Sequence, residues 1–243
     1  MINKDYIEQF WVGLVEGDGT IIVNQDTRKK ILVFRIIIAL NNLEENVTML
    51  SIIKANLGGW MRIERKNKYI VWGSSSTKHI LLLIKIFDKY PLITSRKICQ
   101  LNFMKNCLIN NNLIYFLDNR DKKYELQSLI IKNQEILVLP NYFPAWLSGF
   151  IEAEGCFTKN KNKRGKNYTF RFNIGQNYDE YLIKIIKNYF KSTNKIQLRK
   201  NGIYYCIDMY GLEVKINLNN HFLLNPLLGY KSKSYNNWIN LIN

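Results

Sequence analysis

Two stretches that lie 136 residues apart decide the fold of this chain. Residues 10–21 read FWVGLVEGDGTI, and residues 146–157 read WLSGFIEAEGCF. Each has an apolar run with a glycine at the same place, then an acid, a small residue, a second acid, a glycine and a β-prone segment. Because similarity at a fixed spacing indicates repeated structural units, we expect two related halves.

The similarity continues downstream of both stretches. FRIIIALNN (34–42) matches FRFNIGQNY (170–178) at the same offset, and helical patterns over 43–57 and 181–190 follow. Next come the short segments YPLITSRK (90–97) and NPLLGYKSK (225–233). They are preceded by strand-like runs at 60–65, 69–73, 195–199 and 203–209, and followed by predicted closing helices at 98–109 and 234–242. Each half therefore reads helix, two strands, helix, two strands, helix, helix.

The predicted organisation is an N-terminal half (1–109), a connector (110–143) and a C-terminal half (144–243). The connector contains NNN and DNRDKK, ends near Pro140 and Pro144, and has a helical pattern over 123–131. Since 34 structureless residues would be unusually long for a loop, we expect the connector to pack partly on the surface.

Composition excludes several classes of protein. The chain has 243 residues, 47% of them hydrophobic, so a packed core is expected and wholesale disorder is not. No apolar run reaches the ~18–20 residues of a membrane span, and the acidic residues within 1–10 argue against a secretory signal. Four irregularly spaced cysteines and two histidines disfavour a zinc finger or a disulfide framework and favour a reducing compartment.

The basic excess is concentrated in the predicted strand pairs. Lys plus Arg number 35 against 19 Asp plus Glu, a net charge of +16. The windows 20–35, 60–72, 157–172 and 194–207 contain 17 basic and two acidic residues, which leaves +1 for the rest. An A/T-rich genome, such as an organellar one, would enrich lysine without concentrating it in this way. Basic ribbons with interleaved polar residues suit a DNA groove, although a solvated hairpin face is the alternative.

The motif helices are expected to pack against each other. Gly13 and Gly17 share a helix face, as do Gly149 and Ala153, and small residues at this spacing allow close approach. Gly19 and Gly155 are expected to end the helices because glycine tolerates unusual φ angles.

Packed in this way, the helices bring Asp18 and Glu154 together at their C-terminal ends, where both the helix dipole and mutual repulsion disfavour carboxylates. A cation between them, with Mg²⁺ the best fit to oxygen ligands, explains that cost. The alternative is a pair of buried helices with glycine caps and solvated acids.

The paired motifs resemble the signature of the LAGLIDADG homing endonucleases in their single-chain, two-motif form, over about residues 6–242 except the connector. This resemblance implies an α+β fold of two pseudo-symmetric αββαββα halves, with antiparallel β saddles over DNA and the motif helices at the interface. It also implies that Asp18 and Glu154 bind metal and contact the scissile phosphates, with backbone carbonyls of Gly17 and Ala153 in the metal shell. Glu16 and Glu152 would have structural roles.

Three further residues follow from the resemblance. Family members carry a basic residue five positions after the proline of the PL segment, here Arg96 and Lys231, which could stabilise charge near the phosphate or hold a water. A surface charge at a helix start is the alternative. A polar residue at the end of the second strand, here Gln176, helps to position water. The matching Leu40 departs from the pattern, which predicts unequal halves that cut the two DNA strands with unequal efficiency.

The function expected is site-specific double-strand cleavage of a DNA target of about 20 base pairs, with 3′ overhangs, as in intron homing. The expected cofactor is Mg²⁺ or Mn²⁺, with Ca²⁺ binding without supporting cleavage. The expected partner is double-stranded DNA, with intron RNA as a second candidate and no membrane. The protein is expected to be a monomer in an organelle, most plausibly the mitochondrion. The expected DNA-binding residues are the cations of the strand pairs: Arg28, Lys29, Lys30, Arg35, Arg62, Arg65, Lys66, Lys68, Lys159, Lys161, Lys163, Arg164, Lys166, Arg171, Lys195, Arg199 and Lys200.

Two binding functions are alternatives. An RNA maturase on the same scaffold would assist splicing of its host intron, with or without cleavage activity. A basic RNA-binding protein of an organellar ribosome would need neither acid of the repeat. Among the remaining residues, His79 and His221 are expected to be partly buried and structural, and Cys156 to be a small core residue.

Overall fold

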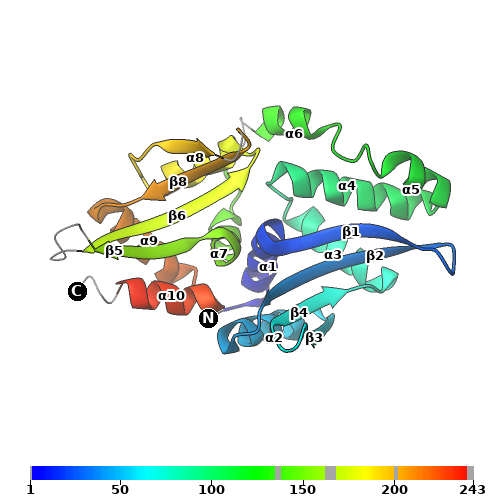
Figure 1. The fold of residues 1–243 in the computed structure, drawn as a ribbon, viewed down its shortest axis with the longest axis horizontal. Coiled ribbons are helices and arrows are strands. Elements are labelled where there is room, and N and C mark those ends of the chain that lie inside the picture. The colour runs from blue at the N-terminus through cyan, green and yellow to red at the C-terminus, as the bar shows by residue number, and fades with distance from the viewer. Residues whose placement is uncertain (1, 135–137, 162–167, 200–201, 240–243) are drawn as a thin grey trace.

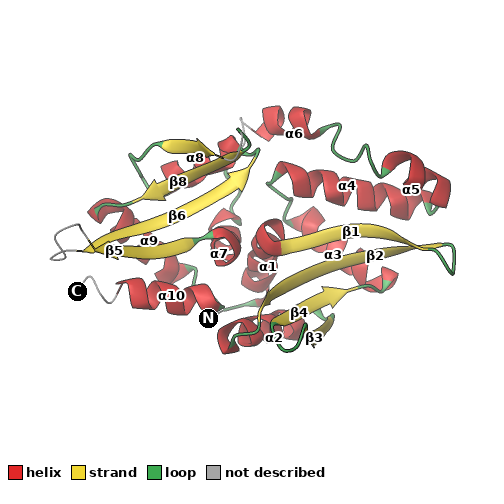
Figure 2. Cartoon of the chain, in the orientation of Figure 1, coloured by secondary structure: helices red, strands yellow, loops and turns green. Residues whose placement is uncertain are grey.

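The computed structural model describes residues 2–134, 138–161, 168–199 and 202–239, and these form two halves with the same order of elements (Figures 1 and 2). The first half contains α1 (Lys4–Asp18), β1 (Gly19–Asp26), β2 (Ile31–Asn41), α2 (Glu44–Leu57), β3 (Trp60–Glu64), β4 (Tyr69–Ser74), α3 (Thr77–Lys89) and α4 (Ser95–Asn110). The second half contains α7 (Phe143–Glu154), β5 (Cys156–Lys161), β6 (Tyr168–Asn177), α8 (Glu180–Tyr189), β7 (Ile196–Arg199), β8 (Tyr204–Met209), α9 (Leu212–Leu224) and α10 (Tyr230–Ile239). The predicted repeat is confirmed.

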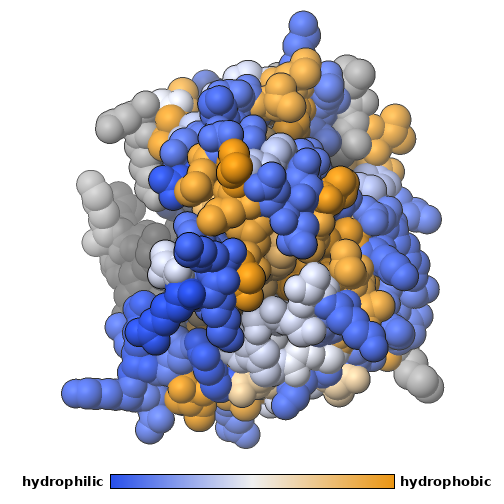
Figure 3. Space-filling model, turned by 90° about the vertical axis from the view of Figure 1, so that its right-hand side faces the viewer, coloured by the Kyte–Doolittle hydropathy of each residue, from blue (hydrophilic) through white to orange (hydrophobic). Residues whose placement is uncertain are grey.

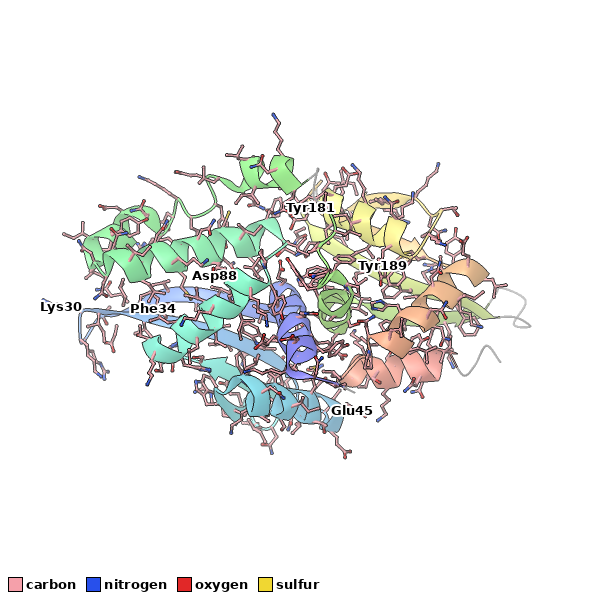
Figure 4. All side chains as sticks on the ribbon, turned by 180° about the vertical axis from the view of Figure 1, so that it is seen from behind. Lys30, Phe34, Glu45, Asp88, Tyr181 and Tyr189 are labelled. Atoms are coloured by element: carbon pink, nitrogen blue, oxygen red, sulfur yellow. The ribbon has the colours of Figure 1, made fainter. Side chains whose placement is uncertain are left out.

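Each half contains one antiparallel sheet of four strands, in the order β1-β2-β4-β3 and β5-β6-β8-β7. In β2 the buried Phe34, Ile36 and Ile38 alternate with the exposed Arg35 and Ala39, as expected for a sheet with one covered face. Seen from behind, the helices lie over the back of both sheets (Figure 4). The opposite face of each sheet is left open, and the two open faces lie side by side in Figure 1.

Helices α1 and α7 cross at the centre of the molecule with almost no side-chain layer between them. A Cβ atom on Gly13 would lie 1.9 Å from the carbonyl oxygen of Trp146, and one on Gly149 would lie 1.9 Å from that of Phe10. Further along, a Cβ on Gly17 would lie 2.3 Å from that of Ala153. The helices therefore need glycine at these positions, which confirms the predicted contact between small residues.

The glycines that follow the two helices are required for a different reason from the one predicted. Gly19 has φ −76° and Gly155 has φ −70°, both ordinary values for any residue, so tolerance of unusual φ is not what selects them. A Cβ on Gly19 would instead lie 2.6 Å from the Val15 oxygen, and one on Gly155 would lie 2.6 Å from that of Ile151. Crowding against the last helical turn excludes a side chain there.

Each closing helix is held by both halves of the molecule. At the start of α4, the Asp179 carboxylate accepts hydrogen bonds from Ser95 N (3.0 Å) and Ser95 Oγ (2.5 Å). At the start of α10, Asn46 Oδ1 accepts from Tyr230 N (3.0 Å). Asp179 belongs to the second half and Asn46 to the first, so each half forms hydrogen bonds with the first residue of the other half's closing helix.

Further contacts flank both of these junctions. Tyr181, labelled in Figure 4, donates its hydroxyl to Ile93 O (2.6 Å) beside α4. Glu45, also labelled, forms an ion pair with Lys233 of α10 (2.6 Å). Because backbone N–H groups at the start of each closing helix have such partners, α4 and α10 begin three and four residues before the predicted 98 and 234.

The connector contains two short helices, α5 (Leu113–Asn119) and α6 (Gln127–Gln134), which run along α4 in Figure 1. Gln127 Nε2 donates to Ser95 Oγ (3.0 Å), and Gln100 Nε2 of α4 donates to Tyr124 OH (2.9 Å). The connector therefore packs on the surface of the first half, as predicted. At this end of the molecule hydrophilic residues surround exposed apolar ones (Figure 3), and Ile109 and Ile114 are among the exposed apolar side chains of α4 and α5.

The remaining predictions about individual residues have mixed outcomes. His221 is buried between Ser148 Oγ and Tyr189 OH (3.0 Å each), and burial lowers its pKa to about 3, as a structural residue requires. His79 is half-buried between Ser74 and Leu57, also as predicted. Cys156 is exposed, so the prediction of a core position was wrong; its side chain falls on the open face of β5. None of the described helices is both long and apolar enough to cross a membrane.

Candidate active site and nucleic-acid interface

The last acids of the two motifs meet where α1 and α7 end. Asp18 is the final residue of α1 and Glu154 the final residue of α7. Because Gly17 has no side chain, Glu154 packs closely: a Cβ on Gly17 would lie 3.3 Å from Glu154 Cγ and 3.6 Å from Glu154 Oε1. The crossing of the glycine-rich helices thus places one acid from each half beside the pseudo-two-fold axis.

The first acids of the motifs point elsewhere and hold the closing helices. Buried Glu16 accepts hydrogen bonds from Ile93 N (2.8 Å), Thr94 N (2.5 Å) and Trp146 Nε1 (2.7 Å). Buried Glu152 accepts from Gly229 N (3.1 Å) and Lys231 N (2.7 Å). Burial raises the pKa of both carboxyls to about 7, and these hydrogen bonds oppose the rise. The positions agree with structural roles, since each acid neutralises the N-terminus of a closing helix.

Two lysines accompany the acids at the crossing. Lys97 Nζ donates to the carbonyl of Gly19, the residue after Asp18. Burial lowers the pKa of Lys97, while Glu16, Asp18 and Glu154 oppose this effect. Although Asp18 is exposed on one side, the surrounding protein raises its pKa to about 6 by desolvation, and Lys231 and Lys97 pull it down. The site therefore combines the carboxyl groups of Asp18 and Glu154 with the positive charges of Lys97 and Lys231.

The structure places the cation of the first half one residue from the predicted one. The Arg96 guanidinium lies 4.1 Å from the ring centroid of Tyr124 in the connector and 5.4 Å from that of Tyr178 in the second half. It is therefore engaged in stacking, and the neighbouring Lys97 is the cation beside the acids. Lys231, in contrast, lies close enough to Asp18 to lower the pKa of that carboxyl, and its role stays a prediction.

Gln176 lies near the end of β6, in register with Tyr205 of β8. Its side chain falls on the same face as Phe172 and Ile174, which is the helix-covered face, and it is half-buried. The equivalent Leu40 of β2 packs against the core. A water-positioning role for Gln176 stays a prediction.

The oxygen donors at the crossing fit a divalent cation such as Mg²⁺. Two carboxylates end side by side, with the backbone carbonyls of Gly17 and Ala153 next to them in sequence. The described residues contain no group of three or more His, Cys, Asp or Glu side chains that could form a closed protein cage. Mg²⁺ typically takes one or two carboxylates and completes its shell with water and phosphate, so this donor set is sufficient.

The predicted DNA-binding residues fall into four groups. Arg35, Arg62, Arg171 and Arg199 lie on the open faces, as the strand registers show. Exposed cations occupy the turns and a strand end: Arg28, Lys29, Lys30, Arg65, Lys66, Lys68 and Lys195. Lys163, Arg164, Lys166 and Lys200 lie outside the described residues, as does the side chain of Lys161. Lys159 is exposed, but it lies two residues after the buried Phe157 in β5. Its side chain therefore falls on the same face as Phe157, opposite to the open face.

Two residues of this region were missed by sequence reasoning. Lys97 stands beside Arg96 in SRK, and only the rotation of α4 about its axis decides which of the two reaches the acids. Asp208 lies one residue beyond the basic window 194–207, on the open face opposite Asn173. Its sequence signal was an acid inside the strand-like run 203–209, which a count of basic residues overlooks.

A profile of the family described as LAGLIDADG endonuclease matches residues 11–107 and 147–242, one copy for each half. The chain is a member of the LAGLIDADG endonuclease family.

Relatives within the LAGLIDADG family match almost the entire chain. A "probable intron-encoded endonuclease aI3" of Debaryomyces hansenii is 38% identical over 96% of this chain, which spans only 38% of that longer protein. A protein of the same name from Dictyostelium citrinum is 38% identical over 98% of this chain and 96% of its own length.

Solved LAGLIDADG structures share the fold at low sequence identity. One of them is I-SmaMI bound to uncleaved DNA target in the presence of calcium ions, which is 17% identical with a TM-score of 0.74. The match covers 96% of this chain and 89% of that one. At this level of identity the likeness concerns the α+β architecture of two similar halves.

Proposed function

We propose that this chain is a site-specific DNA endonuclease that hydrolyses both strands of a long duplex target, as in intron homing. The observation that carries the proposal is the pair of acids, Asp18 and Glu154, which the motif helices bring together between two open sheets. The names of the relatives, intron-encoded endonucleases, support the same reaction.

The acids have the composition of a metal-dependent phosphodiesterase site. Asp18 and Glu154 would hold Mg²⁺ or Mn²⁺, with Gly17 and Ala153 able to add backbone carbonyls; Ca²⁺ would bind without supporting cleavage. When bound, the metal supplies a water of lowered pKa and neutralises charge on the phosphate. The calcium ions present with uncleaved DNA in the I-SmaMI structure support this choice of cofactor.

The lysines complement the acids in this proposal. Lys97, held against the Gly19 carbonyl, and Lys231, beside Asp18, would place positive charge where the attacked phosphate gains negative charge. Gln176 would orient a water from the second half. Arg96 would act only through the packing of α4, because its guanidinium is stacked on Tyr124 and Tyr178.

The open sheets would bind the duplex on either side of these residues. Cations in the turns would contact phosphates, and side chains on the open faces would contact base edges. β2 has 11 residues and β6 has 10, so two strands reaching in opposite directions cover roughly 70 Å, or about 20 base pairs at ~3.4 Å each. A cut near the centre of such a site would be staggered, with 3′ overhangs.

Both acids come from one chain, so we propose that the enzyme acts as a monomer. A/T-rich coding, which the many Asn, Ile, Lys and Tyr residues indicate, and the intron-encoded relatives together support an organellar setting, most plausibly the mitochondrion.

The decisive experiment is selection of cleaved sites from a randomised library of duplex DNA in Mg²⁺, followed by linearisation of a plasmid that carries the selected site. We expect linear product that depends on Mg²⁺ or Mn²⁺ and is lost in Asp18→Asn. Binding of the host intron RNA without cleavage of any duplex would contradict the proposal and favour a maturase.

A further inference from the structure

The open face of the second sheet carries a cluster of polar side chains around one acid. Strand registers place Arg171 and Asn173 of β6, Asp208 of β8 and Gln197 and Arg199 of β7 on this face. Their neighbours of opposite parity, such as Phe172 and Ile207, are buried against the helices. The cluster therefore faces the side on which DNA is proposed to bind.

Asp208 connects the members of this cluster. Its Oδ1 accepts a hydrogen bond from Asn173 Nδ2 (2.9 Å). Its Oδ2 lies 3.6 Å from Arg171 Nη1 and 3.6 Å from Arg199 Nη2. The Asp208 side chain is 15% exposed, whereas those of Arg171 and Arg199 are 39% and 51% exposed. The acid is thus set into the sheet, and the two guanidinium groups lie above it within reach of a ligand.

The guanidinium groups keep most of their hydrogen-bonding capacity. A separation of 3.6 Å is too long for a hydrogen bond, so Asp208 attracts both arginines without saturating their donors. Arg171 Nε is buried without a hydrogen-bond partner among the described residues, so the Nη groups are the donors that face a ligand. Arg199 donates to Gln197 Oε1 through both Nε (3.0 Å) and Nη2, which lays the side chain along β7 and leaves Nη1 without a contact to Gln197. Both arginines are therefore oriented and still able to donate.

The first sheet lacks this arrangement at the equivalent place. The pair Asn173–Asp208 occupies the position of Ile37–Gly73 in the register of the first sheet. Arg35, which matches Arg171 at the repeat offset of 136, is exposed. Because the first sheet forms without a carboxylate there, the sheet itself does not require Asp208.

Phosphate is the less favourable ligand for this cluster. The negative charge of Asp208 cancels one of the two arginine charges and repels an approaching phosphate. Cytosine, whose amino group suits a carboxylate, is also disfavoured because Asp208 is mostly buried and already accepts from Asn173. The edge of guanine presents two acceptors, O6 and N7, which match the forked donors of a guanidinium.

We propose that Arg171 and Arg199 each recognise a guanine in the half of the target that the second sheet covers, and that Asp208 is the positioning residue that orients them. This inference rests on the proposed function, because it assumes a duplex DNA ligand. The inference goes beyond the proposed function because it names guanine as the recognised base and Asp208 as the residue that orients the two arginines.

The experiment is competition binding in Ca²⁺, so that cleavage does not intervene, with a panel that changes each base pair of the selected target singly. For Arg171→Gln and for Arg199→Gln, we expect the preference for one G·C pair to fall by about five- to 150-fold, at a different pair in each variant. Asp208→Asn keeps the shape of the side chain and should weaken both preferences together. The matched control is Glu180→Gln, which removes one negative charge from an exposed ion pair with Lys184 in the same half; its base profile should equal the parental one.

The possible failures are distinguishable. If the parent binds no duplex with sequence preference, the proposed function fails. If the parent is selective but Asp208→Asn and both arginine variants keep the parental base profile, only the inference on this cluster fails. A uniform loss of affinity across all duplexes, with a changed salt dependence, would show that the arginines contact phosphates and would overturn it as well. Thermal midpoints of the variants establish that each compared protein is folded.

Discussion

The two closing helices, α4 and α10, each begin against a buried polar group of the other half, but the chemical nature of that group differs. α4 begins against a carboxylate of the other half, Asp179, whereas α10 begins against an amide, Asn46. Both acceptors are buried, and both bind the first backbone N–H of the helix. The carboxylate site has an additional partner in Ser95 Oγ and is covered by the connector through Gln127. The two junctions thus share a buried acceptor at the first backbone N–H of the helix, which is a carboxylate on one side and an amide on the other.

The same contrast holds at the candidate active site. The halves contribute Asp18 and Glu154, acids of different length, to one crossing. Lys97 reaches the site from α4 and Lys231 from α10, although they stand at different distances from the prolines of the two PL segments. Equivalent placement of a lysine therefore does not require equivalent sequence positions, because the start and rotation of each closing helix decide which side chain faces the acids.

Lys97 and Arg96, neighbouring cations of α4, are expected to differ strongly in their effect on cleavage. Lys97→Gln should lower the single-turnover cleavage rate by about 10²–10³-fold, since a charge beside the reacting phosphate is lost, with little change in DNA affinity. Arg96→Gln, the matched control one residue away, should change the rate only a few-fold. Equal losses in both variants, or a larger loss in Arg96→Gln, would contradict the assignment of Lys97.

The helix crossing should be equally intolerant in both halves. In Gly13→Ala and in Gly149→Ala the added methyl group would lie 1.9 Å from a backbone oxygen of the other helix, so the helices must separate. We expect each variant to lose about 3 kcal/mol in the free energy of unfolding measured with urea, by overpacking at the crossing. A parental value for either variant would break the pseudo-symmetric account of the interface.

A smaller, pH-dependent effect should distinguish the two junctions. Burial raises the pKa of Asp179 from 3.8 to about 6, and its hydrogen bonds with Ser95 oppose the rise. Between about pH 4 and pH 6 the folded state therefore binds a proton that the unfolded chain releases, so this group makes stability fall as pH rises through that window. In Asp179→Asn the fall in the free energy of unfolding from pH 4.5 to pH 7 should be smaller by about 1–3 kcal/mol.

Asn46→Asp is the reciprocal variant, since it places a carboxyl group at the start of α10. In this variant the free energy of unfolding should fall further than in the parent as the pH rises from 4.5 to 7. Glu16 and Glu152, with pKa values of about 7, titrate in all three proteins and cancel in the differences. Identical pH profiles for the parent and Asp179→Asn would show that the carboxylate is not what distinguishes α4 from α10.

The sequence was sufficient for the repeat, the order of the elements and the two acids, because these depend on local periodicity and on a motif copied at a constant offset. It was insufficient where side-chain direction depends on packing between elements. Arg96 and Lys97 are adjacent in the chain, yet only the docking of α4 on Glu16 and Asp179 directs Lys97 towards the acids. The role of Gly19 and Gly155 was misread for a similar reason, since the crowding that requires them comes from the preceding helical turn.

The function of the paired acids is tested most directly by a strand-resolved cleavage assay of Asp18→Asn and Glu154→Gln on the selected target, under single-turnover conditions with excess Mg²⁺ and with DNA binding measured in parallel. Each substitution keeps the shape of the side chain and removes one anionic ligand. Double-strand cleavage should fall by orders of magnitude in both variants, while DNA affinity stays at the parental value or rises because a charge that repels phosphate is gone. If Asp18→Asn cuts both strands at the parental rate, the crossing of α1 and α7 is not the catalytic site.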